Sequence, residues 1–192
     1  MKEIFAVAGA ILILFCTLPY IVDVVKKKTK PNIVTWIIWS VLIGIGAAAL
    51  YASHEFNAGL LLTGDFIATF AVVIVGIKYG AAKLDGFDLL CLVGAIVGLI
   101  LWLVFNSPSI AIAATIIIDF IGTIPTVRHS YHHPEEETWI TFALGVVATI
   151  FTLLSLADYS VSAWVYPAYL LFSNGLLFVT ILLGQRMIAK TD

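Results

Sequence analysis

Seven long apolar segments dominate the sequence, and each is close to the length that a helix needs to cross a lipid bilayer. A spanning helix takes about 20 predominantly apolar residues. Short polar stretches separate the segments, which predicts an all-α membrane protein with seven transmembrane helices. We expect the spans at Ile4–Val22, Ile33–Ala52, Gly59–Lys78, Leu89–Phe105, Ile110–Val127, Trp139–Ala157 and Trp164–Gly184.

The composition favours the same class. Hydrophobic residues make up 61% of the 192 residues and charged residues only 11%, whereas about a quarter of an ordinary soluble domain is charged. A net charge of −2 offers no basic surface for a nucleic acid. We therefore expect the lipid bilayer, and no nucleic acid, among the partners. The first apolar segment ends in Pro19-Tyr20 and a lysine cluster rather than a cleavage pattern, so we expect it to remain as the first helix.

The basic residues predict an orientation, because Lys and Arg are retained in cytoplasmic loops. In a seven-span layout nine of the ten fall on one side, and only Lys2 falls on the other. We expect an integral protein of the plasma, or inner, membrane with its N-terminus outside and its C-terminus in the cytoplasm. The nine residues are Lys26, Lys27, Lys28, Lys30, Lys78, Lys83, Arg128, Arg186 and Lys190.

An internal repeat divides the chain. The Pro, Thr, Trp and Ile of Pro31–Ile37 recur at identical spacing in Pro134–Ile140. Just upstream, Leu18–Ile21 near the end of the first span matches Ile124–Val127 near the end of the fifth. Spans one to three are thus equivalent to spans five to seven, and the fourth span restores the direction of the chain.

This pattern predicts two parallel three-helix bundles joined by a linker helix. The first repeat covers residues 1–80, the linker helix lies in residues 81–108, and the second repeat covers residues 109–192.

In this layout the chain resembles the SWEET and PQ-loop superfamily of membrane transporters. The segment Leu18–Thr29, an apolar residue and Pro followed by a basic run, resembles the PQ-type segment of that family. Where the family has Gln after each proline, this chain has Tyr20 and Thr126. The family's sugar carriers also have prolines inside the second helix of each half, whereas here Pro31 and Pro134 stand only at the starts of these helices.

The resemblance implies a transporter that carries a small polar solute, sugar-like or vitamin-like, by alternating access. Sugar carriers of the family place a polar residue midway along the third helix of each half, and Asp65 and Asn174 look similar in position. Trp39 and Ser40 lie one turn inside the second span, where an indole is able to stack on a sugar ring or a nucleobase. We expect these four residues to contact the substrate.

Asp65 and Asp119 are the only carboxylates inside the apolar spans, and no Lys or Arg lies inside a span to pair with them. An ionised carboxylate at the bilayer centre costs at least ~2.5–3.5 kcal/mol. Each must be protonated, hydrogen-bonded, or facing a proton, a metal ion or a cationic substrate. The alternative is that a protonated aspartate hydrogen-bonds to a neighbouring helix and only stabilises the packing. Asp119 has no counterpart in the first half, and we expect it to couple transport to a proton or cation gradient.

Pro19 and Pro125 lie near the cytoplasmic ends of the first helix of each half. A proline inside a helix removes a hydrogen bond and kinks the chain. We therefore expect hinges at both positions, which would let the inner ends swing while the outer bundle holds.

No cofactor and no resident metal is expected. His129, His132, His133 and Glu135–Glu137 form a compact cytoplasmic group, but their spacing fits no structural zinc pattern. A solvated loop is the expectation there, with metal binding as the alternative. The linker helix contains the GxxxG sequence Gly94–Gly98, which permits close packing within the chain or a homo-oligomer.

The function classes that remain are a transporter and a seven-helix membrane receptor or scaffold that binds a ligand without moving it. The sequence does not separate these two. We expect no enzyme, because no buried His, Ser–His pair or metal-ligand set accompanies the aspartates.

Overall fold

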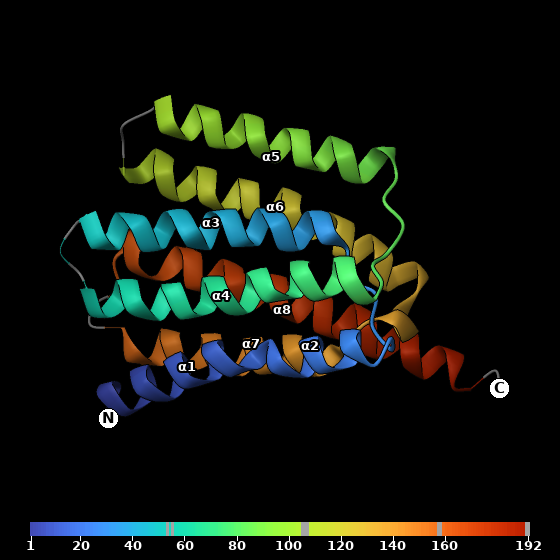
Figure 1. Ribbon diagram of the computed structural model, residues 1–192. Coiled ribbons are helices and arrows are strands. Elements are labelled where there is room, and N and C mark those ends of the chain that lie inside the picture. Colours follow the sequence, from blue (N-terminus) through green and yellow to red (C-terminus); the bar gives the residue numbers. More distant parts are fainter. Residues whose placement is uncertain (53, 55, 105–107, 157–158, 191–192) are drawn as a thin grey trace.

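All the regular structure is helical in the computed structural model, which describes residues 1–52, 54, 56–104, 108–156 and 159–190 (Figure 1). The all-α class is confirmed, and the helices fall at the seven expected positions, with the first position divided between α1 and α2. The elements are α1 Lys2–Cys16, α2 Leu18–Val25, α3 Ile33–Ala52, α4 Phe56–Tyr79, α5 Gly86–Val104, α6 Pro108–His132, the short 3-10 helix η1 Pro134–Glu136, α7 Trp139–Ser155 and α8 Val161–Ile188.

The distribution of side chains indicates an integral membrane protein. Large apolar side chains lie outside, as in Ile67 and Ile77, which are 62% and 72% exposed, whereas polar Thr123 and Thr126 are buried. This is the arrangement that hydrocarbon favours, because polar groups there must find partners inside the protein. Among the described residues, four stretches are long and apolar enough to cross a membrane, namely Lys2–Val25, Leu60–Tyr79, Ile112–His132 and Ala163–Ile188, and three shorter apolar stretches are Ile33–Ala48, Gly86–Ile100 and Trp139–Ser155.

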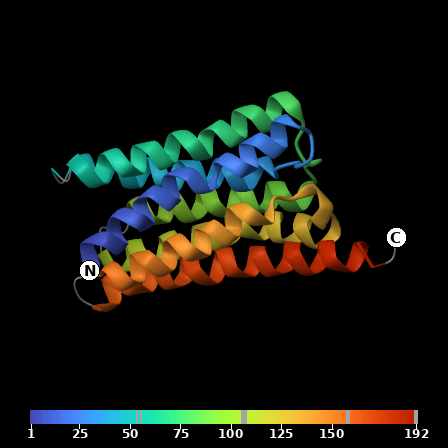
Figure 2. The same ribbon diagram turned by 90° about the horizontal axis from the view of Figure 1, so that it is seen from below.

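Helices that are far apart in the sequence pack side by side (Figures 1 and 2). Helix α4 contacts α3 as well as α1 and α2, and in the same way α8 contacts both α7 and α6. Helix α1 packs on α7, while α3 packs on α6. Helix α5 contacts α6 and α3 and lies at one edge of the bundle (Figure 1). The contacts among α1 to α4 therefore recur among α6 to α8.

Two close contacts between glycine and proline recur in the same way. A Cβ atom added to Gly76 of α4 would lie 2.7 Å from Pro31 Cγ, and one added to Gly184 of α8 would lie 2.6 Å from Pro134 Cγ. Each glycine thus lets a helix approach the proline that precedes α3 or α7. The matching prolines of the sequence repeat have matching partners in space.

The first span is interrupted. Thr17 separates α1 from α2, and Pro19 lies in the first turn of α2. A proline in the first turn costs no hydrogen bond, because that backbone N–H has no partner within the helix. Pro125 differs, since it lies inside α6, which continues beyond it. Hinge motion at either residue stays a prediction.

The expected end of the fifth span at Val127 was wrong, because α6 continues to His132. The extra turn lies beside the start of α5, where its charged and polar side chains find partners. The Arg128 guanidinium bonds to Asp85 and lies 5.1 Å from the centre of the Phe87 ring. Both side chains of this ion pair are 45% exposed, so the pair adds little stability by itself.

Gly184→Ala is expected to destabilise the protein, because the new methyl group would overlap Pro134. Overpacking of this kind costs about 1–3 kcal/mol. Gly175→Ala in the same helix is the matched control, since a Cβ there meets nothing within 4 Å. Thermal unfolding of the purified variants in detergent measures the difference. Equal stability of the two variants would show that the Gly184–Pro134 contact is not tight.

Cysteine labelling tests the layout of the spans. Lys28 and Tyr159 are exposed, whereas Thr29 is buried and unsuited to labelling. Lys28 follows α2 and Tyr159 precedes α8, and the end of α2 and the start of α8 lie at opposite ends of the bundle (Figure 1). In a Cys16→Ala/Cys91→Ala background, we expect Lys28→Cys to react from the cytoplasm and Tyr159→Cys from outside. An impermeant maleimide applied to intact and to permeabilised cells measures this. Reaction of both from the same face would contradict the layout.

Candidate functional site

A buried polar cluster lies around Asp119, near the middle of α6. The Asp119 side chain is buried, and its carboxyl interacts with Trp39 of α3 and Tyr169 of α8. Trp39 Nε1 and Tyr169 Oη are also buried, and neither closes a hydrogen bond with any residue that the structure describes. A buried polar group without a partner costs about 1–3 kcal/mol. We call Asp119, Trp39 and Tyr169 the Asp119 cluster, and a bound solute or water is what would satisfy it.

The contact between α6 and α8 continues this polar character. Thr123 Oγ1 donates to the Asp119 backbone carbonyl at 2.9 Å and lies 3.4 Å from Ser173 Oγ. Tyr169 interacts with both of these hydroxyl groups. The polar side chains of Asp119 and Thr123 therefore point from α6 into the protein.

Asp65 reaches the same region from α4. Tyr166 of α8 interacts electrostatically with both Asp119 and Asp65. The Tyr166 and Tyr169 rings stack, with their centres 6.2 Å apart and 26° between their planes. The two aspartates, on different helices, therefore share an electrostatic neighbour in Tyr166.

Two other predicted contact residues have partners within their own helices. Ser40 Oγ donates to the Trp36 carbonyl at 2.7 Å, and Asn174 Nδ2 donates to the Leu170 carbonyl at 2.9 Å. The Asn174 amide packs against Gly145 of α7. Of the expected substrate contacts, Trp39 interacts with Asp119 directly, and Asp65 shares the neighbour Tyr166 with it. Contact of any of them with a substrate stays a prediction.

The register of α4 and α8 bears on the pairing of Asp65 with Asn174. Asp65 lies eleven residues before Gly76, and Ser173 lies eleven residues before Gly184. Since these glycines make equivalent contacts, this register pairs Asp65 with Ser173, the residue next to Asn174.

A second network closes the end of the bundle where α2, α3 and α7 meet. Glu137, expected in a solvated loop, is only 4% exposed, which corrects that expectation. Its Oε2 accepts a hydrogen bond of 2.8 Å from Tyr20 Oη, and Trp36 Nε1 donates to the same Tyr20 oxygen at 3.4 Å. Glu137 Oε1 has no partner among the described residues. Gln185 of α8 donates to the Glu137 carbonyl at 3.0 Å.

Neighbouring residues extend this closure. Thr138 Oγ1 donates to Asp23 Oδ2 at 3.0 Å and lies 2.6 Å from Thr29 Oγ1. The Lys30 backbone N–H donates to the Glu136 carbonyl at 2.9 Å, and their side chains form an ion pair. We call these contacts, with Tyr20 and Glu137, the Glu137 network. It ties the segment after the first span to the segment before α7.

An aromatic chain joins the two sites. The Tyr20 ring lies 4.6 Å from that of Trp36, and the Trp36 ring lies 5.2 Å from that of Trp39, measured between centres. Trp39 in turn interacts with Asp119. The Glu137 network and the Asp119 cluster are therefore in continuous contact.

Sequence reasoning missed Glu137, Tyr166 and Tyr169. A signal existed for Glu137, because the repeat places Val34 at the equivalent position, and an acid in place of an apolar residue stands out. The tyrosines lie three residues apart in an apolar span, which is typical of many membrane helices. Only the packing of α8 against α6 identifies them.

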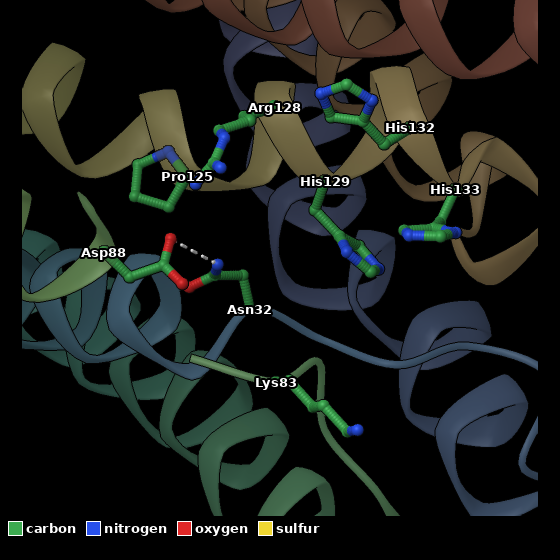
Figure 3. Close-up of a pocket in the computed structure, with 8 residues that line it drawn as sticks. All are labelled: Asn32, Lys83, Asp88, Pro125, Arg128, His129, His132 and His133. Carbon is green, nitrogen blue, oxygen red and sulfur yellow. Dashed lines mark hydrogen bonds between the residues drawn. The ribbon is translucent and has the colours of Figure 1, made fainter. Parts of the chain in front are cut away.

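A cavity of about 160 Å³ lies beside the Glu137 network (Figure 3). Its charged groups are largely paired, since Asn32 Nδ2 donates to Asp88 Oδ1 at 3.1 Å and Arg128 bonds to Asp85. The Asp88 N–H and the Arg128 guanidinium hold the pKa of Asp85 below its ordinary value. Nowhere in the described part of the chain do three His, Cys, Asp or Glu side chains group closely enough to hold a metal ion. The lining residues are Asn32, Lys83, Asp88, Pro125, Arg128, His129, His132 and His133.

Comparison with known proteins adds no relative, because no protein-family model, no curated protein and no solved structure matches this chain. The resemblance to the SWEET and PQ-loop superfamily stays a prediction. The function must be argued from the two sites and the contacts between them.

Stability is expected to depend on pH through Glu137. Burial raises the pKa of its carboxyl from 4.5 to about 8, although the Tyr20 hydrogen bond opposes this. The folded protein therefore holds a proton that the unfolded chain releases. The free energy of unfolding should fall between pH 4.5 and about 8, by up to about 1.4 kcal/mol per pH unit.

Glu137→Gln should flatten this pH dependence, because the amide does not titrate. Glu135→Gln is the control, since the Glu135 side chain is 52% exposed. Thermal unfolding in detergent at a series of pH values measures both. An unchanged slope in the Glu137 variant would show that this carboxyl is ionised in the folded protein.

Proposed function

We propose that the protein is a membrane transporter that moves a small polar solute across the bilayer by alternating access. The observation that carries the proposal is the chain of contacts from Glu137 through Tyr20, Trp36 and Trp39 to Asp119. This chain of contacts links the Glu137 network, which closes one end of the bundle, to the buried Asp119 cluster. A transporter needs this link, because binding at one place must change access at another.

The recurring helix contacts support an arrangement of two parallel three-helix bundles and a linker. In this proposal α4 and α8 are the third helices of the two bundles, and α5 is the linker. Seven spans, an outer N-terminus and a cytoplasmic C-terminus belong to the same proposal. The Glu137 network then lies on the cytoplasmic side, where the basic loops would be.

Opening toward the cytoplasm requires that Tyr20 and Glu137 separate. The Trp36 ring packs on Tyr20 and also on Trp39, so this separation shifts the ring that interacts with Asp119. The break at Thr17 gives the α2 end of the first span freedom to move. Pro125 borders the cavity beside the network, which leaves room on one side of α6. Both observations support the proposed hinges.

A receptor or scaffold would bind a ligand at the same cluster without flux. Uptake into proteoliposomes separates the two functions. The purified protein is tested against a panel of sugars, amino acids and vitamins, with and without a pH gradient. Saturable uptake supports transport, and saturable binding without uptake of any panel member favours the receptor.

Tyr20→Phe tests the link between closure and transport. The variant keeps the ring but loses the hydrogen bond to Glu137, and a bond to a protonated, neutral carboxyl is worth about 0.5–1.5 kcal/mol. We expect the balance between closed and open states to shift roughly two- to tenfold, which changes the uptake rate while equilibrium binding is retained. Tyr131→Phe is the control, because Tyr131 is 75% exposed. An unchanged uptake rate in the Tyr20 variant would contradict the mechanism.

A further inference from the structure

We propose that the solute carries a positive charge, as a small organic ammonium ion held between Asp119 and Asp65 against the rings of Tyr166 and Tyr169. This inference rests on the proposed function, because it names the class of solute that the transporter binds. It follows from three properties of the Asp119 cluster and its surroundings.

The first property is that no basic side chain balances the charge of Asp65 and Asp119. The sequence has no Lys or Arg between Lys30 and Lys78 or between Lys83 and Arg128, so none stands near Asp65 or Asp119 in its own span. The groups that face Asp119 are Trp39, Tyr169 and Tyr166, and those that face Asp65 are Tyr166 and Cys16. All of these partners are neutral or acidic. A positive charge that enters the cluster therefore has two carboxyl groups to meet.

The second property is aromatic surface beside the carboxyl groups. The Trp39 indole and the Tyr169 side chain interact with the Asp119 carboxyl, and the Tyr169 ring stacks on that of Tyr166. Ring faces of Tyr and Trp attract organic cations, and the attraction is about 2 kcal/mol or more when the site excludes water. Carboxyl groups combined with aromatic rings are suited to an ammonium ion.

The third property is the state of the side chains that would recognise a neutral sugar. Ser40 and Asn174 both donate hydrogen bonds within their own helices. Trp39 Nε1 and Tyr169 Oη instead face the Asp119 carboxyl, although neither closes a hydrogen bond of ordinary geometry with a described residue. A small shift of these donors would let them hold the Asp119 carboxylate while its charge faces a cation.

A resident metal ion fits this cluster less well. Metal ions of the hard type take six or more oxygen ligands. The two aspartates approach Tyr166 from different helices, and no group of three metal-ligating side chains exists in the described ranges. An organic ammonium ion needs no such convergence, because one carboxylate and the faces of aromatic rings are enough to hold it.

The test compares cations with neutral molecules of the same shape. Choline is paired with 3,3-dimethylbutan-1-ol, and n-butylammonium is paired with 1-butanol. Binding to the purified full chain in lipid nanodiscs is followed by calorimetry and by tryptophan fluorescence. We expect the cation of at least one pair to bind ten times or more tightly than its neutral partner.

Substitutions identify the residues that cause the preference for cationic over neutral ligands. Asp119→Asn should reduce it to less than twofold, while Asp119→Glu should retain most of it. Asp65→Asn should weaken it severalfold and provides a second measurement if Asp119→Asn fails to fold. Trp39→Phe should bind cations better than Trp39→Leu, because it keeps a ring. Glu3→Gln, an exposed change of the same charge, is the control.

The outcomes separate this inference from transport itself. Equal binding within both pairs, or an unchanged preference in both asparagine variants, would overturn the cationic solute. Uptake of neutral panel members without charge preference would leave transport standing and refute the cation. Charge-selective binding without uptake of either cation would support the cation site and contradict transport.

Discussion

Hydrocarbon cannot satisfy hydrogen bonds, and this constraint shapes the whole protein. Backbone groups are satisfied within helices, which leaves side chains as the only polar groups free to define sites. Apolar side chains such as Ile67 and Ile77 face outward, while Thr123, Ser173 and Asp119 are buried between helices. In a medium of low dielectric each unsatisfied polar group is costly, so the places where such groups persist are the places to look for function.

Two such places, the Glu137 network and the Asp119 cluster, differ in how well they are satisfied. The Glu137 network is rich in hydrogen bonds and ties the ends of helices together, although Glu137 Oε1 lacks a partner. The Asp119 cluster has a carboxyl beside donors that close no bond. The first resembles a closure and the second a binding place. The rings of Tyr20, Trp36 and Trp39 connect them, and this contact is the route by which the proposed mechanism links closure to binding.

The sequence repeat is symmetric in its helices but not in its polar contacts. At the positions equivalent to Tyr20 and Glu137, the chain has Thr126 and Val34. Thr126 is buried, and its hydroxyl has no partner in the part of the chain that the structure describes. The strong hydrogen bond between a phenol and a carboxyl therefore occurs on one side of the repeat only. The two related segments consequently contribute differently to closure.

The sequence by itself determined the all-α class and the helix positions, because length and hydropathy are local properties. The second apolar segment matches α3 at both ends. It also identified Asp65 and Asp119, since an acid in an apolar segment needs no structure to be noticed. The contacts came from the tertiary structure: Arg128 in α6 bonds to Asp85 before α5, and Tyr20 meets Glu137 across 117 residues. Such contacts depend on how helices pack, which no local pattern encodes.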